Sequence, residues 1–328
     1  MDSMSAVGLR NRLSQATGLR LPVSFVFEHP TPAEIARQLL KQVGSGAPDT
    51  GAAEPAGETI SLRLRQAAET GTMPQALRQL LDTAGDRPVF SSAAELPDTD
   101  GRLAQLASGP GRVKVVCVPS YVYVVGSGQE QFMRLADRFE GVRDVHVCSL
   151  PGFGTELSPE SREAAVEVLD GAIRAAVGDA PFVLVGYSMG GVVARSLAAR
   201  LESSGAALAG LAMIDTRALG DNEDEAGRAF AAMLTEILTQ ERRPVSIDDA
   251  SWLSMGGYLR LFTGSRPEPA SARTLMIRAA EPLGGEAVPG GPRWEATDDH
   301  VEVGADHFAL IEAAAADTAD AIERWIEE

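Results

Sequence analysis

Short apolar runs alternate with helix-like segments from residue 112 to the end of the chain. The apolar runs are VKVVCVPS, VHVCSL, FVLVGYS, LAGLAMID and TLMIRAAE. They are apolar at nearly every position, as expected of parallel strands whose two faces are both covered by helices. Helical spacing fills the intervals, for example near QFMRLADRF, over residues 158–177 and through the closing IERWIEE. This order predicts an α/β fold with a mostly parallel sheet.

Charge and composition narrow the range of partners. The chain has 46 acidic and 29 basic residues, a net charge of −17, so its average surface repels nucleic acid and anionic lipid. The first residues, MDSMSAVGLRNRL, lack the apolar centre of a signal peptide, and no stretch is long enough to span a membrane. We therefore expect a cytoplasmic protein. Cys117 and Cys148 lie in apolar strand runs, which favours reduced core residues over a disulfide.

Composition also divides the chain. Residues 1–43 have the spacing of a small helical piece, and residues 44–57, GSGAPDTGAAEPAG, have the composition of a flexible linker. Residues 58–328 form the large domain that carries the alternating pattern. It begins with two amphipathic helices, predicted over 62–68 and 74–81. Their apolar faces are covered either by their own domain or by a second subunit.

A motif for nucleophilic catalysis stands between a predicted strand and a predicted helix. Gly186-Tyr187-Ser188-Met189-Gly190 fits the pattern G-x-S-x-G, with PFVLV before it and GVVARSLAARL after it. In this context the motif is a nucleophile elbow, which predicts the α/β-hydrolase fold and makes Ser188 the nucleophile. Glycine is needed on both sides because the strand and helix approach so closely that a Cβ would collide.

A serine hydroxyl needs a general base to remove its proton, and the chain has four histidines. His307 follows the last short predicted strand, in the sequence GADHF, where a hydrolase places its base. His300 precedes it and stays as a second candidate. His29 lies in the N-terminal piece, and His146 lies inside a strand, where we expect a satisfied structural histidine. This chemistry requires no metal.

The remaining parts of the site are a carboxylate and two amide donors. Asp215 ends one strand and Glu281 ends the next, and position alone does not choose between them; Asp306 is set aside because it adjoins the base. The oxyanion of an acyl-transfer intermediate needs two backbone N–H groups. The sequence offers the amide of Met189 and that of Ser120 or Tyr121 in the loop after VVCVPS, with Tyr121 the predicted donor.

The N-terminal piece resembles a known carrier domain. The segments Asp2-Ser3-Met4-Ser5-Ala6-Val7 and Phe27-Glu28-His29-Pro30-Thr31-Pro32 are similar to the second half of an acyl carrier protein of a modular polyketide synthase, from its phosphopantetheine motif onward. The resemblance implies that Ser3 matches the serine that bears 4′-phosphopantetheine.

The large domain resembles the terminal thioesterase of a type I modular polyketide synthase. The similarity covers the paired N-terminal helices, the Pro151-Gly152-Phe153 loop, the elbow, the strand end at Asp215 and the loop at His307. It implies that Asp215 is the acid, that the N-terminal helices form a homodimer, and that an insertion over about 216–263 covers a substrate channel. Residues implied at the channel and its cover are Tyr187, Phe230, Met233, Trp252 and Tyr258.

The resemblance implies an activity as well. A polyketide chain delivered on the phosphopantetheine of an acyl carrier protein passes to Ser188, then leaves by hydrolysis to an acid or by macrolactonisation. The enzyme itself needs no cofactor. Three alternatives are a free-standing carboxylesterase or lipase, an editing thioesterase that clears short acyl groups, and an inactive hydrolase kept for docking.

Overall fold

The computed structural model describes residues 13, 35, 59–96, 103–123, 128–216, 223–239, 247–263, 271–281 and 297–328. Contacts divide the chain into two compact units, residues 1–57 and 58–328. The predicted linker at 44–57 and nearly all of the predicted carrier piece lie outside the described residues, so their boundaries stay predictions. The second unit is described below.

A seven-stranded sheet lies at the centre of this unit, in the order β2-β4-β3-β6-β7-β8-β9. Its strands are β2 (Leu103–Ala107), β3 (Lys114–Val118), β4 (Val145–Cys148), β6 (Phe182–Tyr187), β7 (Leu208–Ile214), β8 (Thr274–Ala279) and β9 (Asp299–Val303). Every neighbouring pair is parallel except β2 with β4. The predicted α/β fold with a mostly parallel sheet is therefore confirmed.

The helix expected over 158–177 begins later than the sequence suggested. Ser158–Pro159 form the short strand β5, which pairs with β1 (Val89–Phe90) in a separate two-stranded sheet. The helix α7 runs from Arg162 to Val177 and starts where the Ser161 side chain accepts a hydrogen bond from the amide of Ala164. Such a cap satisfies one of the free amides of the first turn, and this fixes the start of the helix.

Strand side chains alternate between the two faces of the sheet because successive residues of a strand point in opposite directions. In β6, Phe182 and Leu184 belong to one apolar cluster, whereas Val183, Val185 and Tyr187 belong to the other. Cys117 and Cys148 lie in different clusters, and both are free and buried, as expected of core residues. Burial raises the pKa of the Cys148 thiol to about 12.

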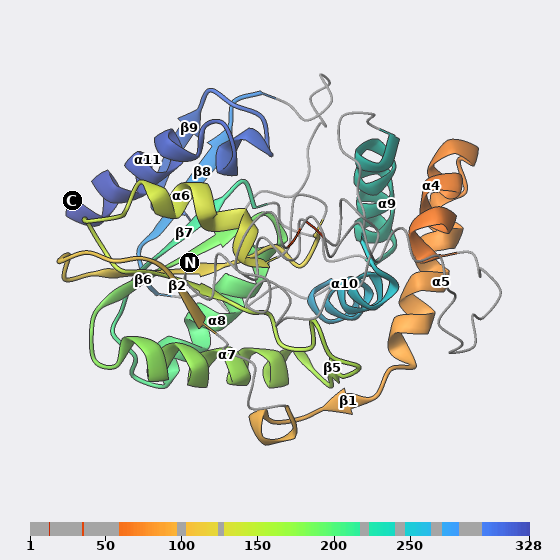
Figure 1. Ribbon diagram of the computed structural model, residues 1–328, viewed down its shortest axis with the longest axis horizontal. Coiled ribbons are helices and arrows are strands. Elements are labelled where there is room, and N and C mark those ends of the chain that lie inside the picture. Colours follow the sequence, from red (N-terminus) through yellow and green to blue (C-terminus); the bar gives the residue numbers. More distant parts are fainter. Residues whose placement is uncertain are drawn as a thin grey trace. The chain divides into compact units, whose positions relative to one another are not determined.

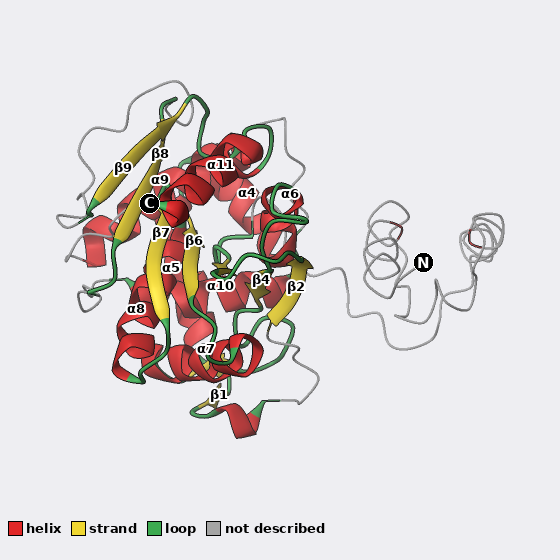
Figure 2. Ribbon diagram, turned by 90° about the vertical axis from the view of Figure 1, so that its left-hand side faces the viewer, coloured by secondary structure: helices red, strands yellow, loops and turns green. Residues whose placement is uncertain are grey.

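Helices cover both faces of the sheet, as Figure 1 shows. The helices α7 and α8 (Met189–Ser203) lie on one side, and α6 (Met133–Asp137) and α11 (Ala315–Glu327) lie on the other. Figure 2 shows the strands side by side between these layers. None of the helices in the described residues is long and apolar enough to cross a membrane.

Four further helices form a group beyond one end of the sheet (Figure 1). They are α4 (Ile60–Thr70), α5 (Met73–Gly85), α9 (Glu223–Thr239) and α10 (Asp249–Phe262). The apolar faces of α4 and α5 pack on α9 and α10, and Leu64 and Leu77 are buried. The sequence left open whether these apolar faces pack on their own domain or on a second subunit. In the structure they pack on their own domain, while Leu62 stays exposed.

The closing helix α11 is attached to the sheet layer by a buried arginine. The guanidinium of Arg143 donates to Glu323 at 2.5 and 2.8 Å, to the carbonyl of Val113 at 3.2 Å, and also to Glu327. Its side chain is 4% exposed. Hydrogen bonds to both carboxylates raise the pKa of Arg143, so the charge stays on the guanidinium.

We expect Arg143→Met to lower the free energy of unfolding by about 2–4 kcal/mol, because Glu323 would lose a buried cationic partner. Arg138→Met is the matched control, since Arg138 also binds α11, at 2.7 Å to Asp320, but through an exposed pair. That control should cost less than about 1 kcal/mol. Urea unfolding of both variants measures the difference, and equal losses would contradict the structural role given to Arg143.

Candidate active site

The residue that connects β6 to α8 has an unusual backbone conformation. Ser188 has φ 52° and ψ −125°, a region that residues with a side chain rarely adopt. Its amide donates to the carbonyl of Ile214 at 2.8 Å, which holds the turn against β7. The sharp turn presents the side chain of Ser188 beyond the carboxyl end of the central strand, as an elbow requires.

The glycines around this turn are needed for close packing. A Cβ on Gly186 would lie 2.5 Å from the Cα of Gly191, and one on Gly190 would lie 2.4 Å from the carbonyl oxygens of Val118 and Pro119. These atoms belong to backbone that cannot move aside. The collision that the sequence motif predicted is therefore present on both sides of the serine.

The His307 side chain lies within hydrogen-bonding distance of both Ser188 and Asp215. Nε2 of His307 is 3.1 Å from Oγ of Ser188, and Nδ1 of His307 is 2.6 Å from Oδ2 of Asp215. The side chains of His307 and Asp215 are each 15% exposed. The second oxygen of Asp215 faces the amide of Ala279 at 3.4 Å. A neutral imidazole in this arrangement can accept a proton from Ser188 while Asp215 holds its other nitrogen.

The alternative candidates lie elsewhere. Glu281 is exposed, and its amide donates to the carbonyl of Ala305. Asp306 accepts from the amides of Phe308 and Ala309 at 2.9 and 2.8 Å, so it holds the turn after the base. His300 is exposed and lies 2.7 Å from Thr297.

His146 differs from the prediction in one respect. It is buried in β4, as expected, but its Nε2 has no hydrogen-bond partner among the described residues. Burial and the nearby charge of Lys114 lower the pKa of His146, so the ring is neutral at neutral pH. Burying a neutral imidazole costs less solvation free energy than burying a charged one, so the ring can lie in the core although Nε2 lacks a partner.

The structure also distinguishes the two amides offered for the second oxyanion donor. The amide of Ser120 already donates to Oε1 of Gln131 at 2.8 Å, and Nε2 of Gln131 donates back to the carbonyl of Ser120 at 3.3 Å. The Ser120 hydroxyl accepts from the amide of Val122 at 3.1 Å. Because Ser120 is used in holding the loop, Tyr121 is the better candidate to pair with Met189.

Aromatic rings next to this loop join it to α10. The Tyr121 ring lies 5.6 Å from that of Tyr258 and 6.3 Å from that of Phe262, measured between ring centroids. The Tyr258 hydroxyl donates to the carbonyl of Pro151 at 2.9 Å. Burial raises the pKa of the phenols of Tyr121 and Tyr258, so both stay neutral.

The five residues predicted to line the channel or its cover lie on three elements, namely α10, α9 and β6. Tyr258 contacts Tyr121, whereas Trp252 donates from its indole to the hydroxyl of Ser61 in α4 at 2.7 Å. Phe230 and Met233 lie on α9, in the same apolar cluster. Tyr187 lies in the cluster on the other face of the sheet.

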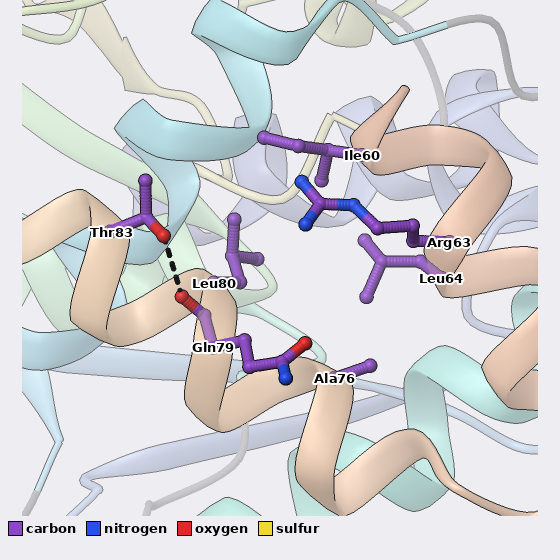
Figure 3. A pocket seen from close by; sticks show the side chains of 7 residues that line it. All are labelled: Ile60, Arg63, Leu64, Ala76, Gln79, Leu80 and Thr83. Carbon is purple, nitrogen blue, oxygen red and sulfur yellow. Dashed lines mark hydrogen bonds between the residues drawn. The ribbon is translucent and has the colours of Figure 1, made fainter. Parts of the chain in front are cut away.

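A separate hollow lies between α4 and α5, as Figure 3 shows. Its lining residues are Ile60, Arg63, Leu64, Ala76, Gln79, Leu80 and Thr83. The Thr83 hydroxyl donates to the carbonyl of Gln79 at 2.9 Å, so it is already engaged within α5 (Figure 3). None of the predicted site residues contributes to this hollow.

The family described as thioesterase domain matches residues 114–326, which is more than half of the chain. The chain belongs to the thioesterase domain family. A second family, described as phosphopantetheine attachment site, matches residues 1–39. The resemblance to a polyketide synthase thioesterase preceded by carrier sequence is confirmed.

Curated relatives of this thioesterase include polyketide synthases. It is 34% identical to erythronolide synthase EryA3 of Saccharopolyspora erythraea over 99% of its own length, which is 10% of that protein. It is 33% identical to the spectinabilin polyketide synthase system protein NorC of Streptomyces orinoci over 99% of its length, which is 14% of that protein. The chain thus spans about a tenth of the length of these relatives.

Solved structures show the same fold. The type II thioesterase BorB from the borrelidin biosynthetic cluster is 21% identical, with a TM-score of 0.52, and the match covers 70% of this chain and 100% of that one. The Vlm2 thioesterase domain, solved with a bound dodecadepsipeptide, is 18% identical, with a TM-score of 0.51 and 69% and 98% coverage. The expected α/β-hydrolase fold is confirmed.

Two residues near the site have positions that the sequence did not reveal. Gln131 holds the loop of Ser120, and Tyr187 contacts His307 instead of the group on α10. A single glutamine in an amphipathic segment carries no signal of its partner. The alternation along β6 does place Tyr187 on the same face as Val185, opposite Leu184, and this could have separated it from the channel.

We expect Gly190→Ala to destabilise the thioesterase by about 2 kcal/mol or more, because its Cβ would meet the backbone of Val118 and Pro119. Gly171→Ala is the matched control, since Gly171 lies in α7 with open space around it. That substitution should stabilise by about 0.5–1 kcal/mol. Thermal unfolding of the two variants measures both signs, and a neutral Gly190→Ala would contradict the close approach.

Proposed function

We propose that this thioesterase releases a polyketide chain from an acyl carrier protein through a Ser188 ester. The observation that carries the proposal is the position of His307 between Asp215 and Ser188, at 2.6 and 3.1 Å, in a chain of the thioesterase domain family. The polyketide synthase relatives support the nature of the substrate. Phosphopantetheine delivery is supported by the family that matches residues 1–39, in which Ser3 is the proposed attachment residue.

In the first half-reaction, His307 Nε2 takes the proton of Ser188 as Oγ attacks the thioester carbonyl. Asp215 keeps the Nδ1 proton in place and stabilises the imidazolium. The amides of Met189 and Tyr121 donate to the oxyanion of the tetrahedral intermediate. When the intermediate collapses, the C–S bond breaks and His307 returns the proton to the leaving thiol of phosphopantetheine.

In the second half-reaction, a nucleophile attacks the Ser188 ester. His307 takes the proton of water, which gives an acid, or of a hydroxyl on the same chain, which gives a macrolactone. Both routes use the same residues and restore Ser188. We propose that Tyr258, Phe230, Met233 and Trp252 form or support the wall along which the acyl chain lies, with Tyr258 next to the oxyanion loop.

The proposed partner is an acyl carrier protein of the same synthase. We also propose a homodimer through α4 and α5, as the resemblance implies, with the exposed Leu62 as the apolar side chain available for the contact. Sedimentation equilibrium tests this, and a monomer at micromolar concentration would contradict it. The cytoplasmic location stays a prediction from the sequence.

Removal of the nucleophile tests the proposed function directly. We expect Ser188→Ala to form no acyl-enzyme with a pantetheine thioester and to lose nearly all turnover, because Ser188 is the hydroxyl that lies 3.1 Å from Nε2 of His307. Intact mass spectrometry and thiol release measure the two effects. A variant that releases thiol at the parental rate would refute the proposal.

The identity of the acid is tested by two matched substitutions. Asp215→Asn should lower kcat by about 10³- to 10⁴-fold, because the amide favours the wrong imidazole tautomer. Glu281→Gln should leave kcat within about twofold, since Glu281 is exposed at the end of the neighbouring strand. The reverse ranking would move the acid to Glu281.

The alternatives predict different substrates. A carboxylesterase would turn over oxygen esters as well as thioesters of the same acyl group, and an editing thioesterase would release short acyl groups faster than long ones. A long hydroxyacyl pantetheine thioester separates the two release routes, because the acid is heavier than the lactone by one water.

A further inference from the structure

Tyr187 lies at the end of β6, immediately before Ser188. Its side chain is 2% exposed and belongs to the apolar cluster that includes Ile214 and Leu310, on the face of the sheet covered by α6 and α11. The sequence predicted that Tyr187 lines the substrate channel. Its burial on this face, away from the cluster that contains Tyr258 and Trp252, points to a different task.

Tyr187 makes two contacts with one residue, His307. Its hydroxyl donates to the backbone carbonyl of His307 at 3.2 Å. Its ring also stacks on the imidazole, with 5.1 Å between centroids and 27° between planes. The two residues are 120 positions apart in the chain, so this pairing depends on the fold.

The other contacts of His307 do not hold its backbone carbonyl. Asp215 holds Nδ1, and Phe308 meets the imidazole edge-on at 5.3 Å between centroids. Asp306 holds the amides that follow the base. The carbonyl of His307 and one face of its ring are held by Tyr187. Without these two contacts from Tyr187, the loop could rotate Nε2 of His307 away from Ser188 while the contact with Asp215 persists.

A single residue thus sets the positions of both nucleophile and base. The backbone of Tyr187 continues directly into the strained turn at Ser188, and its side chain fixes the backbone and the ring plane of His307. A movement of β6 would carry Ser188 and His307 together. The 3.1 Å distance between Oγ and Nε2 would then be maintained.

We propose that Tyr187 is a positioning residue, which acts through His307 to keep the base in line with the nucleophile. This inference rests on the proposed function, because it takes Ser188 and His307 as the reacting pair. The substrate does not need to touch Tyr187. Substitution of Tyr187 should therefore lower kcat and leave KM nearly unchanged.

Tyr187→Phe is the decisive variant, because it removes the hydroxyl and keeps the ring. We expect kcat for thioester release to fall about tenfold, the loss typical of one hydrogen bond, with KM within twofold. The rate of labelling of Ser188 by a fluorophosphonate should fall by the same factor. Tyr187→Leu, which removes both the ring and the hydroxyl, should lower kcat and the labelling rate further.

Thr318→Val is the matched control. The buried Thr318 hydroxyl donates to the carbonyl of Leu310 at 2.7 Å, so it holds the same loop segment without touching His307. We expect a melting temperature lowered as much as in Tyr187→Phe, with kcat within twofold of the parent. An equal loss of kcat in both variants would show that loop stability alone matters, and would overturn the proposal.

A double-mutant cycle tests whether Tyr187 acts through the base. In a His307→Ala background, Tyr187→Phe should change the slow residual labelling rate less than twofold, because there is no imidazole left to position. A tenfold loss in that background would overturn the proposal, as would an unchanged kcat for Tyr187→Phe alone. Failure of the proposed function is recognised separately, by parental turnover in Ser188→Ala.

Discussion

The strained turn at Ser188 is the constraint on which the rest of the site depends. A residue with φ 52° is held there because β6 runs into α8 with no room for a side chain at Gly186 or Gly190. The same close approach brings the end of β3, and with it the loop of Tyr121, next to the start of α8. The glycines that permit this turn therefore also allow β6, α8 and the end of β3 to pack closely together.

Parallel strands place the remaining groups around this turn. Asp215 follows β7, Tyr121 follows β3, and His307 follows β9, so each leaves the carboxyl end of a strand in the same sheet. Residues distant in sequence meet there because all parallel strands end at the same edge. Asp306 holds the amides that follow His307, Tyr187 donates to the His307 carbonyl, and Gln131 holds the loop of Ser120, so each of these loops has its own hydrogen bonds.

The helix α10 is held by contacts with several other elements of the domain. Its Gly256 packs so closely on α5 that a Cβ would lie 2.9 Å from that of Ala84, and Arg87 bonds both Ser254 in α10 and the carbonyl of Thr155. Trp252 and Tyr258 add bonds to α4 and to the loop at Pro151. In the proposed function the acyl chain lies along this helix, and these contacts of α10 would restrict the conformations of that chain.

The sequence by itself determined the fold class and the family resemblance, and it predicted Ser188 as the nucleophile and His307 as the base, because apolar strand runs and the G-x-S-x-G motif are local patterns. Position alone did not separate Asp215 from Glu281, and only the family resemblance favoured Asp215. The sequence offered Ser120 or Tyr121 as the second donor, with Tyr121 the predicted one, and the resemblance assigned Tyr187 to the channel. Only the tertiary structure placed the Asp215 carboxylate at His307, engaged the Ser120 amide with Gln131 and put Tyr187 beneath the base. The physical reason is that a hydrogen bond depends on side-chain direction and on a partner far away in the chain, and neither is written in the local sequence.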